Sequence, residues 1–288
     1  MKNLTYIFMF LMFFTSCKTL KITGEYLDNP PSVVPKVALS TDLNRNNWQH
    51  LDPINDSVPG MSVDKAYTEL IKDSEGQTVV VAVLDTGIDI KHEDLKGNIW
   101  TNKKEIPGNN IDDDKNGFVD DVYGWNFLGE AYYEQLELTR LLGKGEDFPE
   151  KEDAQKDYDK RLAEARGEET LKNYINYDFK GRTTGDDPDN FEETYYGDNK
   201  VEHSREDESH GTHVAGIIAA ARNNNLGMKG VANNVEIMTL RVVPYGDEYD
   251  KDIALGIIYA ADNGADIINT SFGKGFSPHS DKVRDAIA

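Results

Sequence analysis

An uninterrupted apolar run at residues 79–84, followed at once by Asp85, constrains the fold more than any other feature of this chain. A strand that is buried on both faces of a parallel sheet is apolar throughout, and polar side chains follow it at the carboxyl edge of the sheet. Gly87 lies two residues further on, where glycine accepts the backbone angles of a tight turn. The run therefore predicts a central parallel strand that presents a carboxylate where it ends.

Strand-like and helix-like segments alternate along the rest of the chain. The expected strands cover residues 78–84, 235–243 and 265–270, and the expected helices cover 212–222 and 250–262 and begin again near Ser280. This alternation implies right-handed crossovers and an α/β fold of three layers, with a mostly parallel sheet and helices on both faces. The last residues have the pattern of a helix without a C-terminal capping signal. We therefore expect the catalytic domain to be truncated, with an unpaired apolar edge on its sheet.

A second motif opens a helix of small residues with an imidazole, since residues 209–220 read SHGTHVAGIIAA. In serine-hydrolase chemistry an acid orients a histidine, and the histidine deprotonates the nucleophile. The order of acid before histidine along the chain is the order found in subtilisin. The motifs at residues 79–89 and 209–220 resemble those of the subtilisin-like serine peptidases, or subtilases. The resemblance implies that Asp85 orients His210, which is the general base and then the general acid in peptide-bond hydrolysis.

The second histidine of this motif has a different expected role. His213 lies three residues after His210, and we interpret it as a packed structural histidine. A zinc site is the rival interpretation, because two histidines at this spacing can lie on one helical face. The sequence marks no third ligand, so we expect a serine hydrolase without a catalytic metal.

Residues 266–273, which read DIINTSFG, are similar to the subtilase segment that lines the specificity cleft. In that family the backbone beyond the strand pairs with an extended polypeptide substrate through main-chain hydrogen bonds. The resemblance therefore implies that Ser271, Phe272 and Gly273 contact the substrate. A buried strand that ends in a plain loop is the structural alternative, and it explains only the apolar part of the segment.

The nucleophile of the family is not apparent in this chain. Subtilases carry it in a Gly-Thr-Ser-x-Ala string, which does not occur here. The serines after His210 are Ser271, Ser277 and Ser280, and Ser277 lacks the flanking threonine and alanine. We therefore expect two of the three triad residues and no peptidase activity from the chain alone. A peptide-binding protein without catalytic activity is the alternative.

Residues 112–121 read DDDKNGFVDD, with oxygen donors at alternating positions before a glycine, as at the start of a calcium loop. Position twelve of the loop is Tyr123 in place of a bidentate glutamate, so another acid has to close the site. The family resemblance implies that structural calcium is bound. It also adds Asp94, the acid of the string His-x-Asp-Leu at residues 92–95, to the candidate ligands. A plain acidic turn is the alternative. The candidate ligands are Asp94, Asp112, Asp114, Asn116 and Asp120.

The acid and the histidine are separated by many more residues than in compact subtilases, which indicates an insertion at about residues 130–205. Its segment 134–173 is rich in charged residues with interspersed leucines, a pattern that suggests exposed helices. A solvated charged surface is the simple interpretation, and a substrate-selecting lid is the alternative. The whole chain has 52 acidic and 31 basic residues, and this net charge of -21 argues against nucleic acid and anionic lipid as partners.

The first residues have the pattern of a targeting segment. An apolar stretch at residues 4–14 is too short to span a bilayer and precedes Cys17 in a string that resembles a relaxed bacterial lipobox. We expect a signal peptide at 1–17, a tether at 18–47 without a folded propeptide, and an incomplete catalytic domain at 48–288. A lipid on Cys17 would anchor an exported lipoprotein at the periplasmic or cell surface and would be its only membrane contact. A secreted protein with an incidental cysteine is the alternative.

Overall fold

The computed structural model describes residues 46–288 apart from 73, 75, 146, 165–168, 204, 206 and 207. Cys17, the signal segment at 1–17 and the expected tether as far as residue 45 lie outside the described residues. Within the described part of the chain, no helix has the length and the apolar composition that crossing a bilayer requires.

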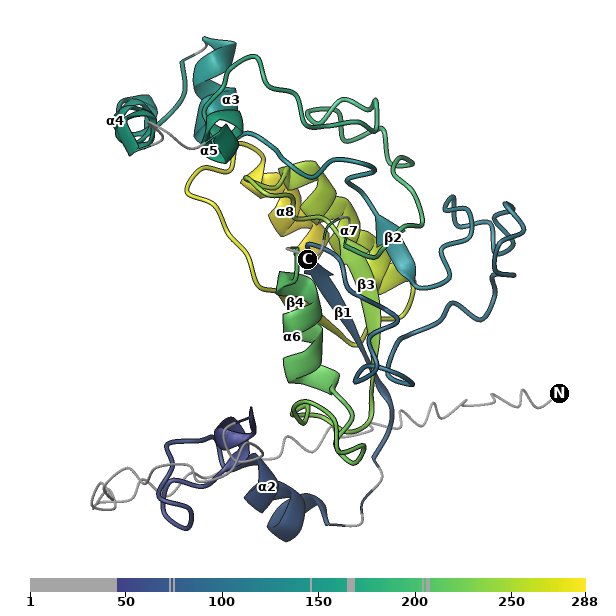
Figure 1. Ribbon diagram of the computed structural model, residues 1–288. Helices are drawn as coiled ribbons and strands as arrows, with labels where there is room; N and C mark the ends of the chain where they lie inside the picture. Colours follow the sequence, from purple (N-terminus) through teal and green to yellow (C-terminus); the bar gives the residue numbers. More distant parts are fainter. Residues whose placement is uncertain are drawn as a thin grey trace, which may run out of the picture. The chain divides into compact units, whose positions relative to one another are not determined.

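A parallel four-stranded sheet lies at the centre of the fold (Figure 1). Its strands are β1 (Val79–Asp85), β2 (Gly124–Asn126), β3 (Val235–Arg241) and β4 (Ile267–Thr270), in the spatial order β2-β3-β1-β4. β1 is a central strand, as its apolar run predicts, and Asp85 is the last residue of that strand. β4 is at the edge of the sheet, where Ile267 is 54% exposed.

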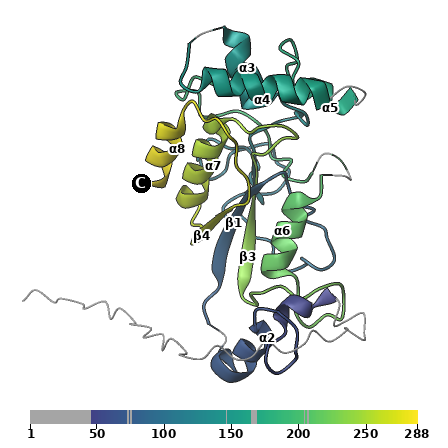
Figure 2. The ribbon, with the colours of Figure 1, turned by 90° about the vertical axis from the view of Figure 1, so that its left-hand side faces the viewer.

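Helices cover both faces of this sheet (Figure 2). α6 (His210–Ala219) packs on one face, and α7 (Asp250–Asp262) and α8 (Ser280–Ile287) pack on the other. Because successive residues of a strand point to opposite faces, β1 contributes to both cores. The core on the α6 side contains Val81, Val83, Ala215, Ala219 and Ile237, and the core on the α7 side contains Ala82, Leu84, Leu240, Ile253 and Ile257. The predicted α/β class is therefore confirmed.

Most element boundaries agree with the sequence pattern to within a few residues. α7 covers the predicted residues 250–262, and α8 begins at the predicted Ser280. α6 begins at His210 instead of residue 212. The sequence does not predict β2, because this strand has only three residues and begins at Gly124, and glycine is a poor strand former. A β-carbon on this glycine would lie 1.9 Å from the carbonyl oxygen of Thr239, so the pairing of β2 with β3 requires glycine here.

A lead-in segment precedes β1 and contains three short helical turns, η1 (Trp48–His50), α2 (Val63–Ala66) and η2 (Tyr67–Ile71). The buried His50 ring shares a hydrogen bond of 2.8 Å between Nε2 and the Lys229 carbonyl oxygen. The Tyr67 hydroxyl donates to the Val231 carbonyl at 2.9 Å. These contacts join the lead-in segment to the loop between α6 and β3.

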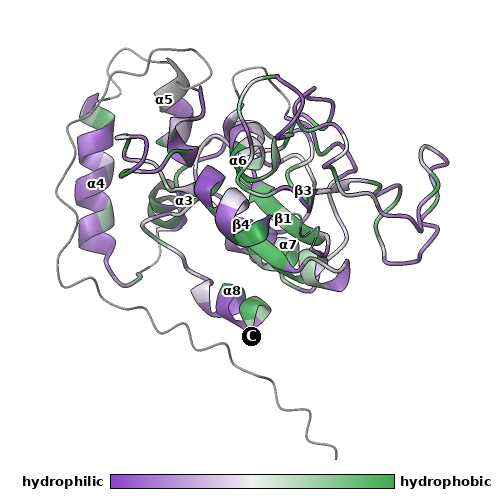
Figure 3. Ribbon diagram, turned by 90° about the horizontal axis from the view of Figure 1, so that it is seen from below, coloured by the Kyte–Doolittle hydropathy of each residue, from purple (hydrophilic) through white to green (hydrophobic). Residues whose placement is uncertain are grey.

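The acidic segment at about residues 130–205, which the sequence predicts to be an insertion, contains α3 (Glu137–Lys144), α4 (Lys151–Glu164) and α5 (Glu169–Tyr174). α4 is polar and largely exposed, as predicted (Figure 3). For α3 the prediction of an exposed helix is wrong, because both Glu137 and Arg140 are buried in its first half. A charged segment can be buried when its charges are paired, and α3 pairs with the loop before α7 and with the loop between β4 and α8.

Candidate active site

The end of β1 and the start of α6 meet at one point, which is the candidate active site. The His210 Nδ1 atom lies 2.8 Å from Asp85 Oδ1 and 3.0 Å from Asp85 Oδ2. A carboxylate only accepts hydrogen bonds, so the neutral imidazole carries its proton on Nδ1, and the lone pair on Nε2 can accept a proton from a nucleophile. The structure thus brings together the two residues that the motifs predict as a pair.

Glycines on both sides of this contact let the two backbones approach closely. A β-carbon on Gly211 would lie 2.3 Å from the carbonyl oxygen of Gly87, a separation too short for packed atoms. Gly87 has a φ of 111°, which side chains on other residues disfavour. The Gly211 amide donates to the Thr86 hydroxyl at 3.2 Å. The first turn of α6 is therefore held directly against the turn after β1.

The acid of this pair is buried, and the imidazole is open to solvent. The side chain of Asp85 is 2% exposed, whereas that of His210 is 56% exposed. A cleft of about 710 Å³ runs past the imidazole, and its lining includes His92, Asp94, Glu208, His210, His213 and Tyr245. A histidine in this position can reach a group bound in the cleft, while the buried carboxylate attracts the imidazolium more strongly than it would in water.

His213 also lines the cleft, and it is exposed, so the interpretation as a packed structural histidine is wrong. The reason is that Ala215 and Ala219 are the α6 residues that face the sheet, which turns His213 away from the core. Among the described residues, no third histidine, cysteine or acid places a ligand atom close to both His210 and His213. The geometry therefore does not provide the zinc site that was the rival interpretation.

The segment Ser271–Gly273 begins beside the acid of the site. Thr270 pairs with Leu84 in the register of the sheet, so this segment starts at the level of Asp85. Phe272 is partly buried against the core on the α7 side, while its two neighbours are exposed. With the aromatic side chain turned inward, the backbone lies at the surface, as main-chain pairing with an extended peptide requires.

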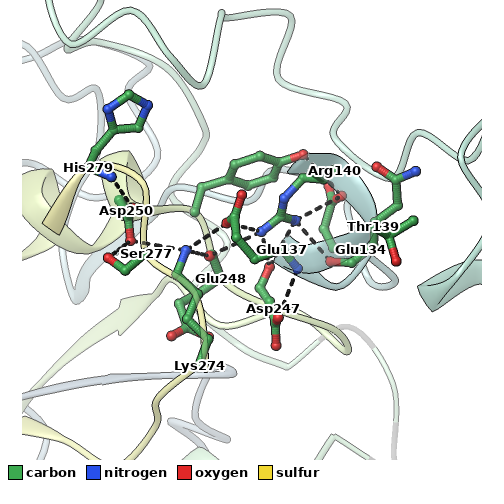
Figure 4. Close-up of polar contacts among 12 residues, drawn as sticks. Glu134, Glu137, Thr139, Arg140, Asp247, Glu248, Asp250, Lys274, Ser277 and His279 are labelled. Carbon is green, nitrogen blue, oxygen red and sulfur yellow. Dashed lines mark hydrogen bonds and ion pairs between the residues drawn. The ribbon is translucent and has the colours of Figure 1, made fainter. Parts of the chain in front are cut away.

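Buried ion pairs connect the insertion to the continuation of this segment (Figure 4). Glu137 of α3 accepts hydrogen bonds from Arg140 at 2.7 Å and from Lys274 at 2.8 Å. Lys274 also lies 3.0 Å from Asp250 at the start of α7. The hydroxyl of Ser277 donates to the same Asp250 carboxylate at 2.9 Å. The insertion thus contacts the loop that follows the candidate substrate segment.

Opposite charges keep the buried carboxyl groups of Glu137 and Asp186 ionised. Burial alone raises the pKa of Glu137, but the positive charges of Arg140 and Lys274 bring that pKa below its ordinary value. In the adjoining cluster, burial likewise raises the pKa of Asp186, and hydrogen bonds from Arg182 and Lys251 more than offset this and lower it to about 2. α3 is therefore buried as part of a set of compensated charges, since an unpaired charge in the same place would be strongly disfavoured.

Three acids of the loop at residues 101–121 are close enough to bind one cation. The ligand oxygens of Glu105, Asp112 and Asp114 lie within 4.8 Å of one another. Carboxylate oxygens are the ligands that Ca²⁺ prefers, so this donor set fits calcium. Sequence reasoning missed Glu105 because it precedes the alternating motif. Its carboxylate accepts the backbone amides of Asp113 and Asp114, and this folds it into the loop.

The other candidate calcium ligands have different surroundings. The two oxygens of Asp120 accept hydrogen bonds from the backbone amides of residues 108–110. The Asn116 side chain donates to Asp121 at 2.8 Å. Asp94 lines the cleft beside the imidazole and does not join the group of three acids. Of the five predicted ligands, the structure brings two together with a glutamate that was not predicted.

Residues 76–288 match the sequence profile described as the Subtilase family. "Subtilisin-like protease 1" of Plasmodium berghei (strain Anka) is 28% identical over 211 residues, which are 71% of this chain and 23% of that protein. "Cell wall-associated protease" of Bacillus subtilis (strain 168) is 47% identical over 72 residues, 25% of this chain and 8% of that protein. "Thermophilic serine proteinase" of Bacillus sp. (strain AK1) is 52% identical over 66 residues, 23% of this chain and 16% of that protein. The chain spans less than a quarter of the length of each of these relatives.

Proposed function

This chain belongs to the subtilase family, and from that premise we propose that it is part of a serine endopeptidase with an Asp-His-Ser triad. Asp85 and His210 are the first two members of the triad. The observation that supports this most directly is the hydrogen bond of 2.8 Å between His210 Nδ1 and Asp85 Oδ1. It holds the imidazole in the tautomer that accepts a proton at Nε2.

The reaction is acyl transfer from a peptide bond to serine and then to water. His210 Nε2 takes the hydroxyl proton as the serine oxygen attacks the scissile carbonyl, and it delivers this proton to the leaving amine. In the second half, the same nitrogen takes a proton from the water that hydrolyses the acyl-enzyme and returns it to the serine oxygen as the carboxylic acid product leaves. Asp85 keeps the ring oriented and stabilises the imidazolium that forms in each half.

Polypeptide substrates bind in extended form along the segment Ser271–Gly273 in this proposal. The exposed backbone of the segment supplies the main-chain partners, and the partly buried Phe272 holds the segment to the core. The position of the segment at the level of Asp85 brings a bound peptide near the imidazole.

The nucleophile in this proposal is none of the serines that follow His210. The hydroxyl of Ser277 donates to Asp250, and that of Ser271 accepts a hydrogen bond from Asn269 at 2.9 Å. The 288-residue chain on its own should therefore lack peptidase activity, since removal of the nucleophile leaves only weak residual catalysis.

A serine-directed fluorophosphonate probe tests this assignment. The 288-residue chain is expected to stay unlabelled, and the product of the complete reading frame is expected to be labelled at one serine and to lose the label in a His210→Ala variant. Labelling of Ser271, Ser277 or Ser280 would refute the placement of the nucleophile. A complete protein that stays unlabelled but binds an extended peptide would support the alternative, a peptide-binding protein without catalytic activity.

The loop at residues 101–121 holds a structural calcium ion in this proposal, with Glu105, Asp112 and Asp114 as ligands. A cation bound only to the folded state stabilises it by about 2.7 kcal/mol at a hundredfold excess over Kd. We predict that chelation lowers the Tm by about 5–10 °C, as measured by circular dichroism with and without calcium. Asp112→Asn should remove most of this shift, and the exposed Asp153→Asn should retain it. A calcium-dependent shift of equal size in both variants would contradict the site.

Export and lipid attachment at Cys17 complete the proposal and concern residues outside the described part of the chain. Metabolic labelling with an alkyne fatty acid is expected to mark the wild-type precursor expressed in bacteria but not a Cys17→Ser variant. The labelled protein should also partition into the detergent phase. An unlabelled wild-type protein released into the medium would support the alternative of a secreted enzyme.

A further inference from the structure

The Arg241 side chain connects both catalytic motifs through a single buried guanidinium. Arg241 is the last residue of β3, and its side chain is 1% exposed. Its Nε donates to the Thr86 carbonyl at 3.0 Å, and Nη2 donates to the Glu208 carboxylate at 3.0 Å. Thr86 directly follows the acid of the site, and Glu208 lies two residues before His210. One planar group thus contacts the backbone after the acid and a side chain just before the histidine.

The same guanidinium contacts the start of the insertion. Nη1 of Arg241 donates to the Gly129 carbonyl at 3.1 Å, and Nη2 donates to the Ala131 carbonyl at 2.9 Å. These residues lie at the start of the predicted insertion at about 130–205, and Glu208 follows its end in the sequence. One side chain therefore contacts the chain on both sides of this segment.

The position of Arg241 in the sheet places it next to the backbone of the acid. In the register of β1 and β3, Arg241 lies opposite Asp85. The Asp85 carbonyl oxygen accepts the amides of Val242 and Val243 at 2.9 and 3.1 Å. The backbone at the acid and just after it is thus held by Arg241, the last residue of β3, and by the two residues that follow this strand. A shift of the guanidinium would move the turn after the acid relative to the start of α6.

We propose that Arg241 is a positioning residue that, through its contacts with Thr86 and Glu208, sets the distance at which Asp85 meets His210. The inference rests on the proposed function, because it assigns a role in orienting the triad. Lysine cannot replace arginine here, since only the planar fork donates to several acceptors in fixed directions. A buried ion pair adds little net stability compared with packed apolar side chains, so a role in orientation is the better reason for its presence.

Another buried ion pair in the molecule offers a matched control. Arg182 lies 2.9 Å from Asp252, with side-chain exposures of 9% and 0%. This pair joins the insertion to α7, and in the described part of the chain the side-chain hydrogen bonds of Arg182 go to Asp186 and Asp252, which lie outside both catalytic motifs. Glu208→Gln and Asp252→Asn each remove one buried negative charge at nearly constant shape. They differ in whether the partner arginine touches the catalytic motifs.

The test measures the tautomer of the neutral His210 ring in the 288-residue chain by long-range ¹H–¹⁵N NMR, with denaturant unfolding in parallel. In the wild type and in Asp252→Asn, the Nδ1–H form is expected to dominate. In Glu208→Gln, the ratio of the Nε2–H form to the Nδ1–H form is expected to rise about tenfold, the effect of weakening one hydrogen bond. The double variant Arg241→Met/Glu208→Met should show the same rise without an unpaired buried charge, while it loses the hydrogen bonds that Arg241 donates to the Thr86, Gly129 and Ala131 carbonyls.

The outcomes separate this inference from the proposed function. An unchanged tautomer ratio in Glu208→Gln, together with a loss of stability like that of Asp252→Asn, would show that the pair is merely structural. An unchanged ratio in the folded double variant would overturn the inference as well, and if that variant fails to fold, Glu208→Gln decides. A wild-type ring without a dominant Nδ1–H form would refute the triad geometry itself, and the inference with it.

Discussion

Asp85→Asn is expected to lower the peptidase activity of the complete enzyme by about 10⁴-fold while the fold stays intact. The asparagine amide can donate to His210 Nδ1, so the ring would carry its proton on Nε2 and could not accept the serine proton. The single remaining oxygen of the side chain, Oδ1, would keep its hydrogen bond from the Thr86 amide, which is 2.7 Å long in the wild type. The measurement is kcat on a peptide substrate, with the ring tautomer determined by NMR.

Asp89→Asn provides the control for this substitution. Asp89 is four residues further along the same motif, and its carboxylate accepts the Lys91 amide at 3.0 Å instead of contacting His210. The control should keep wild-type kcat and the Nδ1–H tautomer. If Asp85→Asn keeps more than a tenth of the wild-type kcat, the carboxylate does not orient the histidine and the proposed triad is wrong.

Arg182→Met is expected to destabilise the protein by about 3–5 kcal/mol, because it leaves the fully buried Asp252 without a counterion. In the wild type, Arg182 donates to Asp252 at 2.9 Å through both terminal nitrogens and to Asp186 at 2.7 Å. The measurement is the free energy of unfolding in urea. Arg161→Met is the matched control, because its ion pair with Asp157 lies on the exposed α4 and should contribute less than about 1 kcal/mol.

The pH dependence of unfolding gives a second readout of the same cluster. Hydrogen bonds from Arg182 and Lys251 outweigh the effect of burial and hold the pKa of Asp186 at about 2, below its ordinary value of 3.8. A depressed pKa contributes stability above the ordinary value, and this contribution is lost as pH falls from about 4 to about 2. Arg182→Met should flatten this part of the stability profile. A variant with the wild-type acid profile would show that Asp186 does not depend on the guanidinium.

The elements that could be predicted have strong local patterns. The run at residues 79–84 predicts β1 because only a strand buried on both faces is apolar at every position. α7 has the predicted bounds because it is apolar from Ile253 onward and Asn263-Gly264 ends it, although it is buried on nearly all sides and not along one stripe. The pairing of Asp85 with His210 could be expected from the resemblance of two long motifs, each with the glycines that close backbone contact requires.

The features that could not be predicted depend on partners far away in the chain. α3 has the composition of a solvated helix, yet Glu137 is buried because Lys274, 137 residues later, supplies a counter-charge. Arg241 has no local motif, and its role follows only from the acceptors that surround it. His213 shares a motif with His210 but faces the cleft, because the alanines of α6 occupy the sheet side.

The amino-acid sequence by itself predicted the central strand and the α/β class, since apolar runs act over a few neighbouring residues, and the resemblance of its two motifs predicted that Asp85 and His210 meet. Only the tertiary structure decided which charged side chains are buried and which acids of the 101–121 loop converge. The physical reason is that a buried charge is stable only beside its partner, and the partner is chosen by the folded chain rather than by its neighbours in sequence.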